Sequence, residues 1–257
     1  MRFLVLATGS KGNCAYIATP HAQVLVDCGV GPRKLGQLLA RHGISPSQID
    51  AVFISHVHSD HTQGLGPLLR RAPARIYCQE GAAAQLAAEV RGVSGIAIPD
   101  LKPFANGDGF HHRDVDVLPV RVSHDAEPTV MYKFFAGGRR IGILTDLGSY
   151  DERVLGAFRD CDVLLLEANH DLHLLAHGPY PAFLKQRIRG KQGHLSNDQA
   201  AQFVTALPAL PGRLLLGHLS EVNNRPEVAS AAFSRIETGH IPHLVIPQGV
   251  CGPLLEL

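Results

Sequence analysis

Four apolar stretches of the chain each lead to a side chain that can bind a metal ion. Each stretch is four to eight residues long and rich in aliphatic residues, as is typical of a buried β-strand. Residues 51–54, 116–123, 140–145 and 213–217 lead to His56, His124, Asp146 and His218, respectively. Because rigid strands present functional groups at their carboxyl ends, we expect a site there.

Helical stretches alternate with these strands. They are expected at residues 33–41, 81–90, 197–206 and 227–238. Ser196, Asn197 and Asp198 form an N-cap cluster before the third helix, and Pro226 opens the fourth. The order predicts an α/β fold. With 257 residues and 45% hydrophobic content, the chain can bury a full core, and we predict one domain over residues 1–257.

The densest group of donors follows the first apolar run, where residues 55–61 read Ser-His-Val-His-Ser-Asp-His. In an extended chain His56 and His58 can point to one place while Asp60 and His61 turn to another. A catalytic zinc needs three protein ligands and an open position. Four donors here, with more downstream, favour two cations over one and over a merely solvated turn.

This motif resembles the metallo-β-lactamase superfamily, whose signature His-x-His-x-Asp-His stands at residues 56–61. Within the superfamily, the chain is most similar to the YycJ group, also called WalJ or VicX. The segments that carry this likeness are residues 9–14, 166–171, 178–181, 193–197 and 218–220. The resemblance implies a four-layer αββα sandwich with a dinuclear site at one edge.

The resemblance also implies a ligand set. His56, His58 and His124 would hold one metal, Asp60, His61 and His218 would hold the other, and Asp146 would bridge them. Two such cations share and activate a water, so a metal-bridging hydroxide is the expected nucleophile. Histidine-rich ligation favours zinc, and manganese stays open.

His194 is the predicted catalytic acid, and Asp60 is counted with it as catalytic through its metal. Residues 193–196 resemble the segment that carries a non-ligand histidine in phosphodiesterases such as tRNase Z and PhnP. A histidine can protonate a leaving group near neutral pH. The alternative is a structural neighbour of the Ser196 cap. Four more residues at strand ends are expected to contact ligands or substrate: Asp27, Glu167, Asn169 and His170.

A basic stretch lies just before His194. Its four cations are Lys185, Arg187, Arg189 and Lys191. If the stretch is helical, Lys185 with Arg189 and Arg187 with Lys191 form two ridges. Such ridges suit a phosphate backbone, although an ordinary solvated helix face has the same composition.

The YycJ likeness, His194 and the basic stretch favour a phosphodiester substrate, and the likeness implies a 5′-directed DNA exonuclease. Two alternatives stay open. One is a small-molecule hydrolase, either a cyclic phosphodiesterase or a thioesterase like glyoxalase II. The other is a regulatory protein with structural metals. The choice between DNA and RNA is not determined by these motifs.

Five cysteines without close pairs predict buried thiols rather than disulfides or a zinc knuckle. The first eight residues lack the long apolar segment of a signal peptide, and no run approaches the roughly 20 apolar residues that cross a bilayer. We therefore expect a cytoplasmic protein without a membrane partner. A homo-oligomer is compatible with the sequence.

Overall fold

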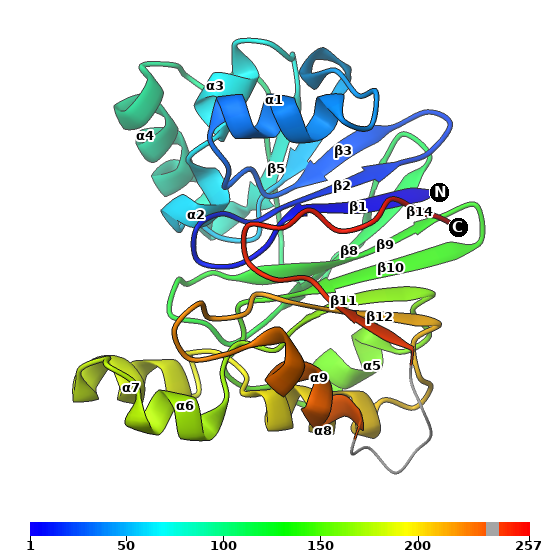
Figure 1. Ribbon diagram of the computed structural model, residues 1–257. Coiled ribbons are helices and arrows are strands. Elements are labelled where there is room, and N and C mark those ends of the chain that lie inside the picture. Colours follow the sequence, from blue (N-terminus) through cyan, green and yellow to red (C-terminus); the bar gives the residue numbers. More distant parts are fainter. Residues whose placement is uncertain (235–241) are drawn as a thin grey trace. The chain divides into compact units, whose positions relative to one another are not determined.

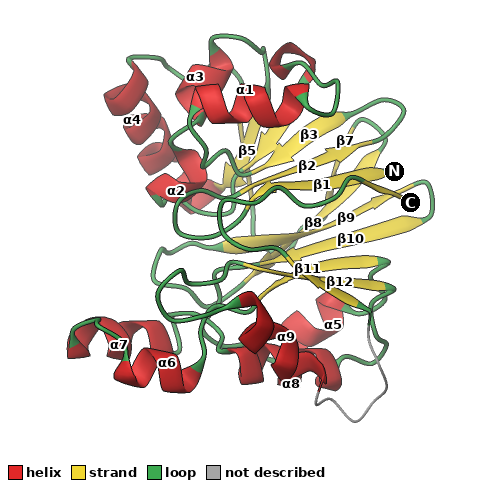
Figure 2. Cartoon of the chain, viewed as in Figure 1, coloured by secondary structure: helices red, strands yellow, loops and turns green. Residues whose placement is uncertain are grey.

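The computed structural model describes residues 1–234 and 242–257 (Figures 1 and 2). The chain divides into two compact units. Unit 1 contains Met1–Pro119, Ala126–Val130 and Gly249–Leu257, and unit 2 contains Val120–Asp125 and Met131–Gln248. The single domain over residues 1–257 stays a prediction, and each unit is described by itself.

Unit 1 is built on a sheet with strand order β14-β1-β2-β3-β4-β5-β6. Its strands are β1 (Arg2–Ala7), β2 (Cys14–Ala18), β3 (Gln23–Val26), β4 (Ala51–Phe53), β5 (Arg75–Gln79), β6 (Leu101–Phe104) and β14 (Leu255–Glu256). Strands β3 to β6 run parallel, and their register aligns Val26 with Phe53 and Phe53 with Tyr77. This register brings the residues after β3 and β4 to the same edge.

Helices cover one face of this sheet, where Figure 1 shows α1, α3 and α4. The helical segments of unit 1 are α1 (Pro32–Ala40), η1 (Pro46–Gln48), α2 (Ser59–Thr62), α3 (Leu65–Leu69), η2 (Glu80–Ala82) and α4 (Ala83–Ser94). Each covering helix turns an apolar stripe inward, for example Leu35, Leu38 and Leu39 of α1. These side chains pack with Val52 and Ile76 in one buried cluster.

In unit 2, the strands follow the order β13-β12-β11-β10-β9. They are β9 (Val130–Ala136), β10 (Arg139–Leu144), β11 (Val163–Glu167), β12 (Arg213–Gly217) and β13 (His243–Val245). The hairpin of β7 (Phe110–His112) and β8 (Val115–Arg121) leads the chain from unit 1 into unit 2. Strands β10 to β13 run parallel, with Leu144 opposite Leu166 and Glu167 opposite Gly217.

The helices of unit 2 are α5 (Glu152–Phe158), α6 (Leu172–His177), α7 (Ala182–Arg189), α8 (Asn197–Ala206) and α9 (Pro226–Ser234). Figure 1 shows α5, α8 and α9 against the strands, with α6 and α7 side by side at one end of the unit. A capping box between Ser196 and Gln199 begins α8. The predicted helix 197–206 is confirmed, and residues 235–238 of the helix predicted at 227–238 lie outside the described residues.

All five cysteines are free, as predicted, and four are buried; Cys251 is partly exposed, because it lies in the chain end that leads to β14. Burial raises the pKa of the Cys28 thiol to about 12, so this thiol stays protonated near neutral pH. In the described part of the chain, each helix is too short or too polar to cross a membrane.

Candidate metal centre

The motif residues of unit 1 lie on a loop that leaves β4 and enters α2. His56 and His61 are buried, whereas His58 and Asp60 are partly exposed. His58 is the N-cap of α2, and Asp60 and His61 lie within the helix. This tight turn brings together the four predicted donors that we call the loop cluster, His56, His58, Asp60 and His61.

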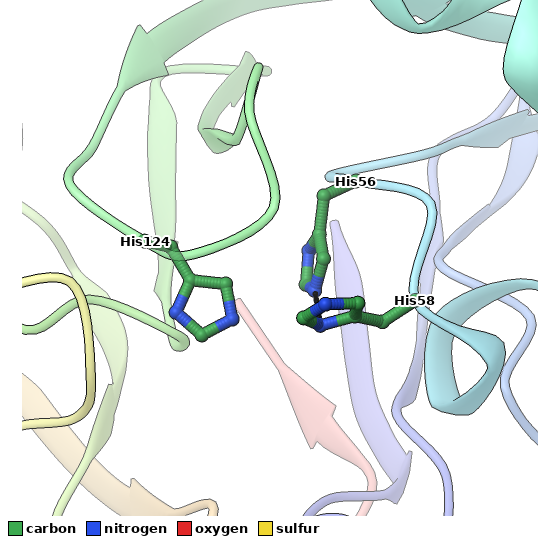
Figure 3. Close-up of side chains that lie close together, drawn as sticks. All are labelled: His56, His58 and His124. Atoms are coloured by element: carbon green, nitrogen blue, oxygen red, sulfur yellow. Dashed lines mark hydrogen bonds between the residues drawn. The ribbon is translucent and has the colours of Figure 1, made fainter. Parts of the chain in front are cut away.

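Two ring nitrogens of the loop cluster face each other. The Nε2 atom of His56 lies 3.1 Å from the Nδ1 atom of His58, as the dashed line in Figure 3 shows; the third ring drawn there, His124, belongs to unit 2. Two nitrogens bound to one tetrahedral zinc are about 3.3 Å apart, given bond lengths of about 2.0–2.1 Å. The donor type and this spacing fit a shared cation.

Asp27 orients the loop cluster from the end of β3. Its carboxylate accepts hydrogen bonds from the backbone N of Ser55 (2.8 Å) and from Nδ1 of His61 (2.7 Å). A carboxylate can only accept here, so the proton of His61 lies on Nδ1 and its Nε2 atom carries the lone pair. Asp27 therefore contacts a predicted ligand.

Asn13 and Ser55 also lie at this site, although the sequence motifs did not predict them as site residues. The Nδ2 atom of Asn13 donates to Asp60 Oδ2 (3.2 Å) and lies 2.9 Å from His61 Nε2. The Ser55 hydroxyl lies 3.0 Å from Nδ1 of His56 and also contacts Asp27. The signals were present, because Asn13 lies within the segment 9–14 that carries the resemblance and Ser55 begins the motif.

Backbone packing holds the same loop. The Asp60 carbonyl accepts from the N–H of Asn13 at 2.8 Å, and the His61 carbonyl accepts from Cys28 at 2.8 Å. A Cβ atom on Gly29 would lie 1.5 Å from the Asp60 carbonyl oxygen. Only glycine allows the two backbones to approach this closely.

In unit 2, four donors form the group that we call the strand-end cluster: His124, Asp146, His194 and His218. Three of them follow the strands β8, β10 and β12, and His194 lies in the loop between α7 and α8. One donor atom each of Asp146, His194 and His218 lies within 4.8 Å of the others. Asp146 Oδ2 is 3.1 Å from His218 Nδ1, close to the spacing of two ligands on one zinc. Unit 2 therefore has a second group of donors that fits a divalent cation.

The backbone is unusual at these strand ends. Asp146 and His218 have φ angles of 52° and 53°, and Asp27 in unit 1 has 58°. Side chains other than glycine adopt this left-handed region at a cost of about 1–3 kcal/mol, and such residues gather at functional sites. Asp146 and His218 adopt this conformation just after β10 and β12 end, and there their side chains contact each other.

His124 is anchored through one nitrogen. Its Nδ1 atom donates to the Gly193 carbonyl at 3.2 Å, so Nε2 carries the lone pair, 3.3 Å from Asp125 and 4.0 Å from Asp146. Burial lowers the pKa of His124 despite the nearby carboxylates. A neutral imidazole with a fixed tautomer is the form that binds metal.

His194 is held by a buried carboxylate. Glu167 Oε2 accepts from Nδ1 of His194 at 3.0 Å, and Glu167 Oε1 accepts from the backbone N of Leu147 and of Leu195. Burial disfavours the protonated ring, but the charge and hydrogen bond of Glu167, with Asp146 and Asp125, outweigh it and raise the pKa of His194 to about 9. The ring is thus a potential proton donor.

Asn169 and His170 differ in their contacts. Asn169 donates to the backbone carbonyl of His218 at 3.0 Å, so it supports the turn of that predicted ligand. The His170 ring is buried, and within the described residues neither of its nitrogens has a hydrogen-bond partner. Burial lowers the pKa of His170 to about 4, which keeps the ring neutral.

The basic stretch is only partly helical. Lys185, Arg187 and Arg189 lie on α7, but the helix ends at Arg189, so the expected ridge of Arg187 with Lys191 does not form. The cause is the extended conformation of Gly190, which ends the helix before Lys191. Arg187 instead pairs with Asp125 at 2.5 Å.

Comparisons with known proteins agree with this architecture. The model of the beta-lactamase superfamily domain matches residues 22–219. The exodeoxyribonuclease WalJ of Streptococcus pneumoniae is 35% identical over 89% of this chain and 85% of its own length. The exodeoxyribonuclease YycJ of Bacillus anthracis is 30% identical over 92% and 89%, respectively.

Solved structures show the same fold. The metallo-beta-lactamase fold protein YhfI of Bacillus subtilis aligns with a TM-score of 0.73 at 17% identity, over 98% of this chain and 99% of its own. Zinc-bound PqqB of Methylobacterium extorquens aligns over the full length of both chains, with a TM-score of 0.73 at 16% identity. The predicted family, fold class and assignment to metal-dependent hydrolases are confirmed. The chain belongs to the beta-lactamase superfamily, in the group that contains WalJ and YycJ.

Proposed function

We propose that this protein is a metal-dependent exonuclease that hydrolyses phosphodiester bonds from the 5′ ends of DNA. The observation that carries the proposal is the pair of His194 and Glu167 beside Asp146 and His218. A protonated imidazole next to metal donors is suited to a leaving oxygen that departs as an alkoxide, as in a phosphodiester. The likeness to exodeoxyribonucleases supports DNA as the substrate.

The seven residues predicted as ligands stay the proposed metal ligands: His56, His58, Asp60, His61, His124, Asp146 and His218. We propose two divalent ions, with zinc favoured by the histidines and manganese as the alternative. When bound, two such ions polarise the phosphate and activate a water. Asp60 is catalytic in this proposal through the ion it binds.

The chain's own residues orient these donors and supply the proton. Asp27 keeps the proton of His61 on Nδ1, and the Gly193 carbonyl does the same for His124. Glu167 holds Nδ1 of His194, so a proton on its Nε2 would pass to the leaving oxygen. Cations at Lys185, Arg187, Arg189 and Lys191 would attract the DNA backbone. We place this activity in the cytoplasm.

The test is cleavage of duplex DNA that carries a labelled 5′-phosphate, with zinc or manganese, and with EDTA and the Asp60→Ala variant as controls. We expect release of labelled mononucleotide that depends on metal and is lost in the variant. A label at the 3′ end should instead remain on progressively shorter DNA. Intact DNA under both metals, with metal content confirmed, would contradict the proposal and favour a small-molecule hydrolase.

A further inference from the structure

The two helices α6 and α7 form a basic projection of unit 2 (Figure 1). Lys185 Nζ donates to the Ala176 carbonyl at 2.8 Å and so links the two helices. No residue of α7 is fully buried. The sequence contains no Asp or Glu between Asp171 and Asp198, although it contains four Lys and Arg residues there. The α7 part of this segment therefore has a strongly positive surface and little packing function.

One face of α7 borders a hollow with a volume of about 540 Å³. Lys185 and Arg189, one helical turn apart, both line it. Two cations beside a hollow without acidic residues attract polyanions, and consecutive phosphates of a nucleic acid strand are such a ligand.

Phe183 occupies another face of α7. Its exposed fraction is 74%, which is high for a side chain of this size. Residues four apart in a helix share a face, so Phe183 shares its face with Arg187. Proteins bind unpaired bases with an exposed aromatic ring that has a cation beside it, here Phe183 with Arg187. The ring stacks on the base, and the cation attracts the phosphate of the same nucleotide.

The face with Phe183 is connected to the strand-end cluster. Arg187 pairs with Asp125, and Asp125 Oδ1 is 3.3 Å from Nε2 of His124. The hydroxyls of Ser123 and Ser149 both donate to the Lys191 carbonyl, at 2.9 and 3.0 Å. These bonds attach the carboxyl end of α7 to the loops that carry His124 and Asp146. A strand end held by α7 would thus lie close to these donors.

We infer that the Phe183 ring stacks on an unpaired base at the DNA end, with Arg187 on the same face of α7 beside the phosphate of that base. Lys185 and Arg189, on the face that borders the hollow, attract phosphates farther along the same strand. The inference rests on the proposed function and adds a preference for frayed or overhanging ends. Loss of the stacking contact between one base and one aromatic ring typically weakens DNA binding by about tenfold. Blunt, fully paired ends should depend less on Phe183.

The experiment compares the wild type with the variants Phe183→Leu and Phe183→Trp on duplexes with a short 5′ overhang and on blunt duplexes. Leu210→Ala, another exposed apolar residue of unit 2 (40% exposed), is the control. We expect Phe183→Leu to raise the KM for the overhang about tenfold with kcat within about twofold. Phe183→Trp and Leu210→Ala should match the wild type.

A second readout reports stacking directly. The fluorescent base 2-aminopurine is placed at the terminal unpaired position of DNA whose first linkages are phosphorothioates. Wild type and Phe183→Trp should quench its fluorescence, and Phe183→Leu should not. Equal KM and equal quenching for Phe183→Leu and wild type would overturn the inference, as would a dimer of the chain that Phe183→Leu dissociates. The failure of this inference can be distinguished from the failure of the proposed function. If the wild type cleaves no DNA, the proposed function itself fails. If the wild type cleaves DNA and substitution of Phe183 has no effect, only this inference fails.

Discussion

The loop cluster and the strand-end cluster present similar donors by different means. His56, His58, Asp60 and His61 come from one short loop, and their geometry depends on a local turn and on the backbone contact with Gly29. The strand-end donors come from segments between residues 124 and 218. Asp146 and His218 follow β10 and β12, which the parallel register with β11 aligns, whereas His124 and His194 are held by the Gly193 carbonyl and by Glu167. A local motif can be recognised by its letters, but a cluster assembled by a sheet depends on pairing between distant segments.

The largest effect is expected from Asp146→Asn, which removes a carboxylate of the strand-end cluster. Asparagine tolerates the left-handed backbone, so the turn should survive. Loss of the charge between proposed metal ligands should lower the rate of DNA cleavage by about 10³-fold or more and reduce the bound metal. Kinetics and elemental analysis measure both. Asp160→Asn, an exposed residue with φ of 57°, is the matched control and should behave as wild type.

Gly29→Ala should damage the loop cluster by displacing the backbone of Asp60. The close contact leaves no space for a methyl group, so the free energy of unfolding should fall by about 1–3 kcal/mol or more. We expect a parallel loss of metal binding. Gly31→Ala is the control, since nothing lies within 4 Å of a Cβ there. Equal stability of the two variants in denaturant titrations would refute this explanation of the loop.

His194→Gln should separate proton donation from metal binding. We expect DNA cleavage to slow by about 10²–10³-fold, because the leaving alkoxide loses its acid. An activated ester such as bis(p-nitrophenyl) phosphate has a leaving group that needs no proton, so its hydrolysis should change little. Metal content should stay at the wild-type level. A variant that loses its metal would instead make His194 a ligand.

Asp27→Asn and Glu167→Gln compare the residues that support each cluster. Asp27 orients His61, and supports of this kind change metal affinity by about 10–100-fold. Glu167 contacts His194 rather than a proposed ligand, so Glu167→Gln should leave metal affinity near wild type and slow DNA cleavage. Competition with a fluorescent chelator measures the affinities. If both variants lost metal affinity equally, Asp27 and Glu167 would not differ in role as proposed.

The smallest effect is expected from Lys185→Gln and Arg189→Gln. Each substitution should weaken DNA binding a few-fold and reduce the slope of log affinity against log salt by about 0.7–0.9, the value for one phosphate contact. Fluorescence anisotropy at several salt concentrations measures the slope. Arg71→Gln in unit 1 is the control. If the slope of log affinity against log salt is unchanged in the α7 variants, Lys185 and Arg189 do not contact phosphates and are ordinary solvated surface residues.

Much of the fold and site could be predicted because their signals are local. Apolar runs predicted β4, β8, β10 and β12, and the cap at Ser196 predicted the start of α8. The motif at residues 56–61 named four donors, and its resemblance named the family that the comparisons confirm. Each of these features lies within a few neighbouring residues, where chain geometry leaves few alternatives.

Only the tertiary structure decided which distant residues touch. Asn13 contacts Asp60, and Ser55 contacts Asp27, because of the strand order in unit 1. Glu167 meets His194 because β11 ends beside the segment before α8. The end of α7 at Arg189 and the pairing of Arg187 with Asp125 likewise depend on packing. The sequence by itself therefore determined the family, the main elements and the types of donor. Their partners, tautomers and protonation depend on burial and on contacts between distant segments, which a one-dimensional pattern does not specify.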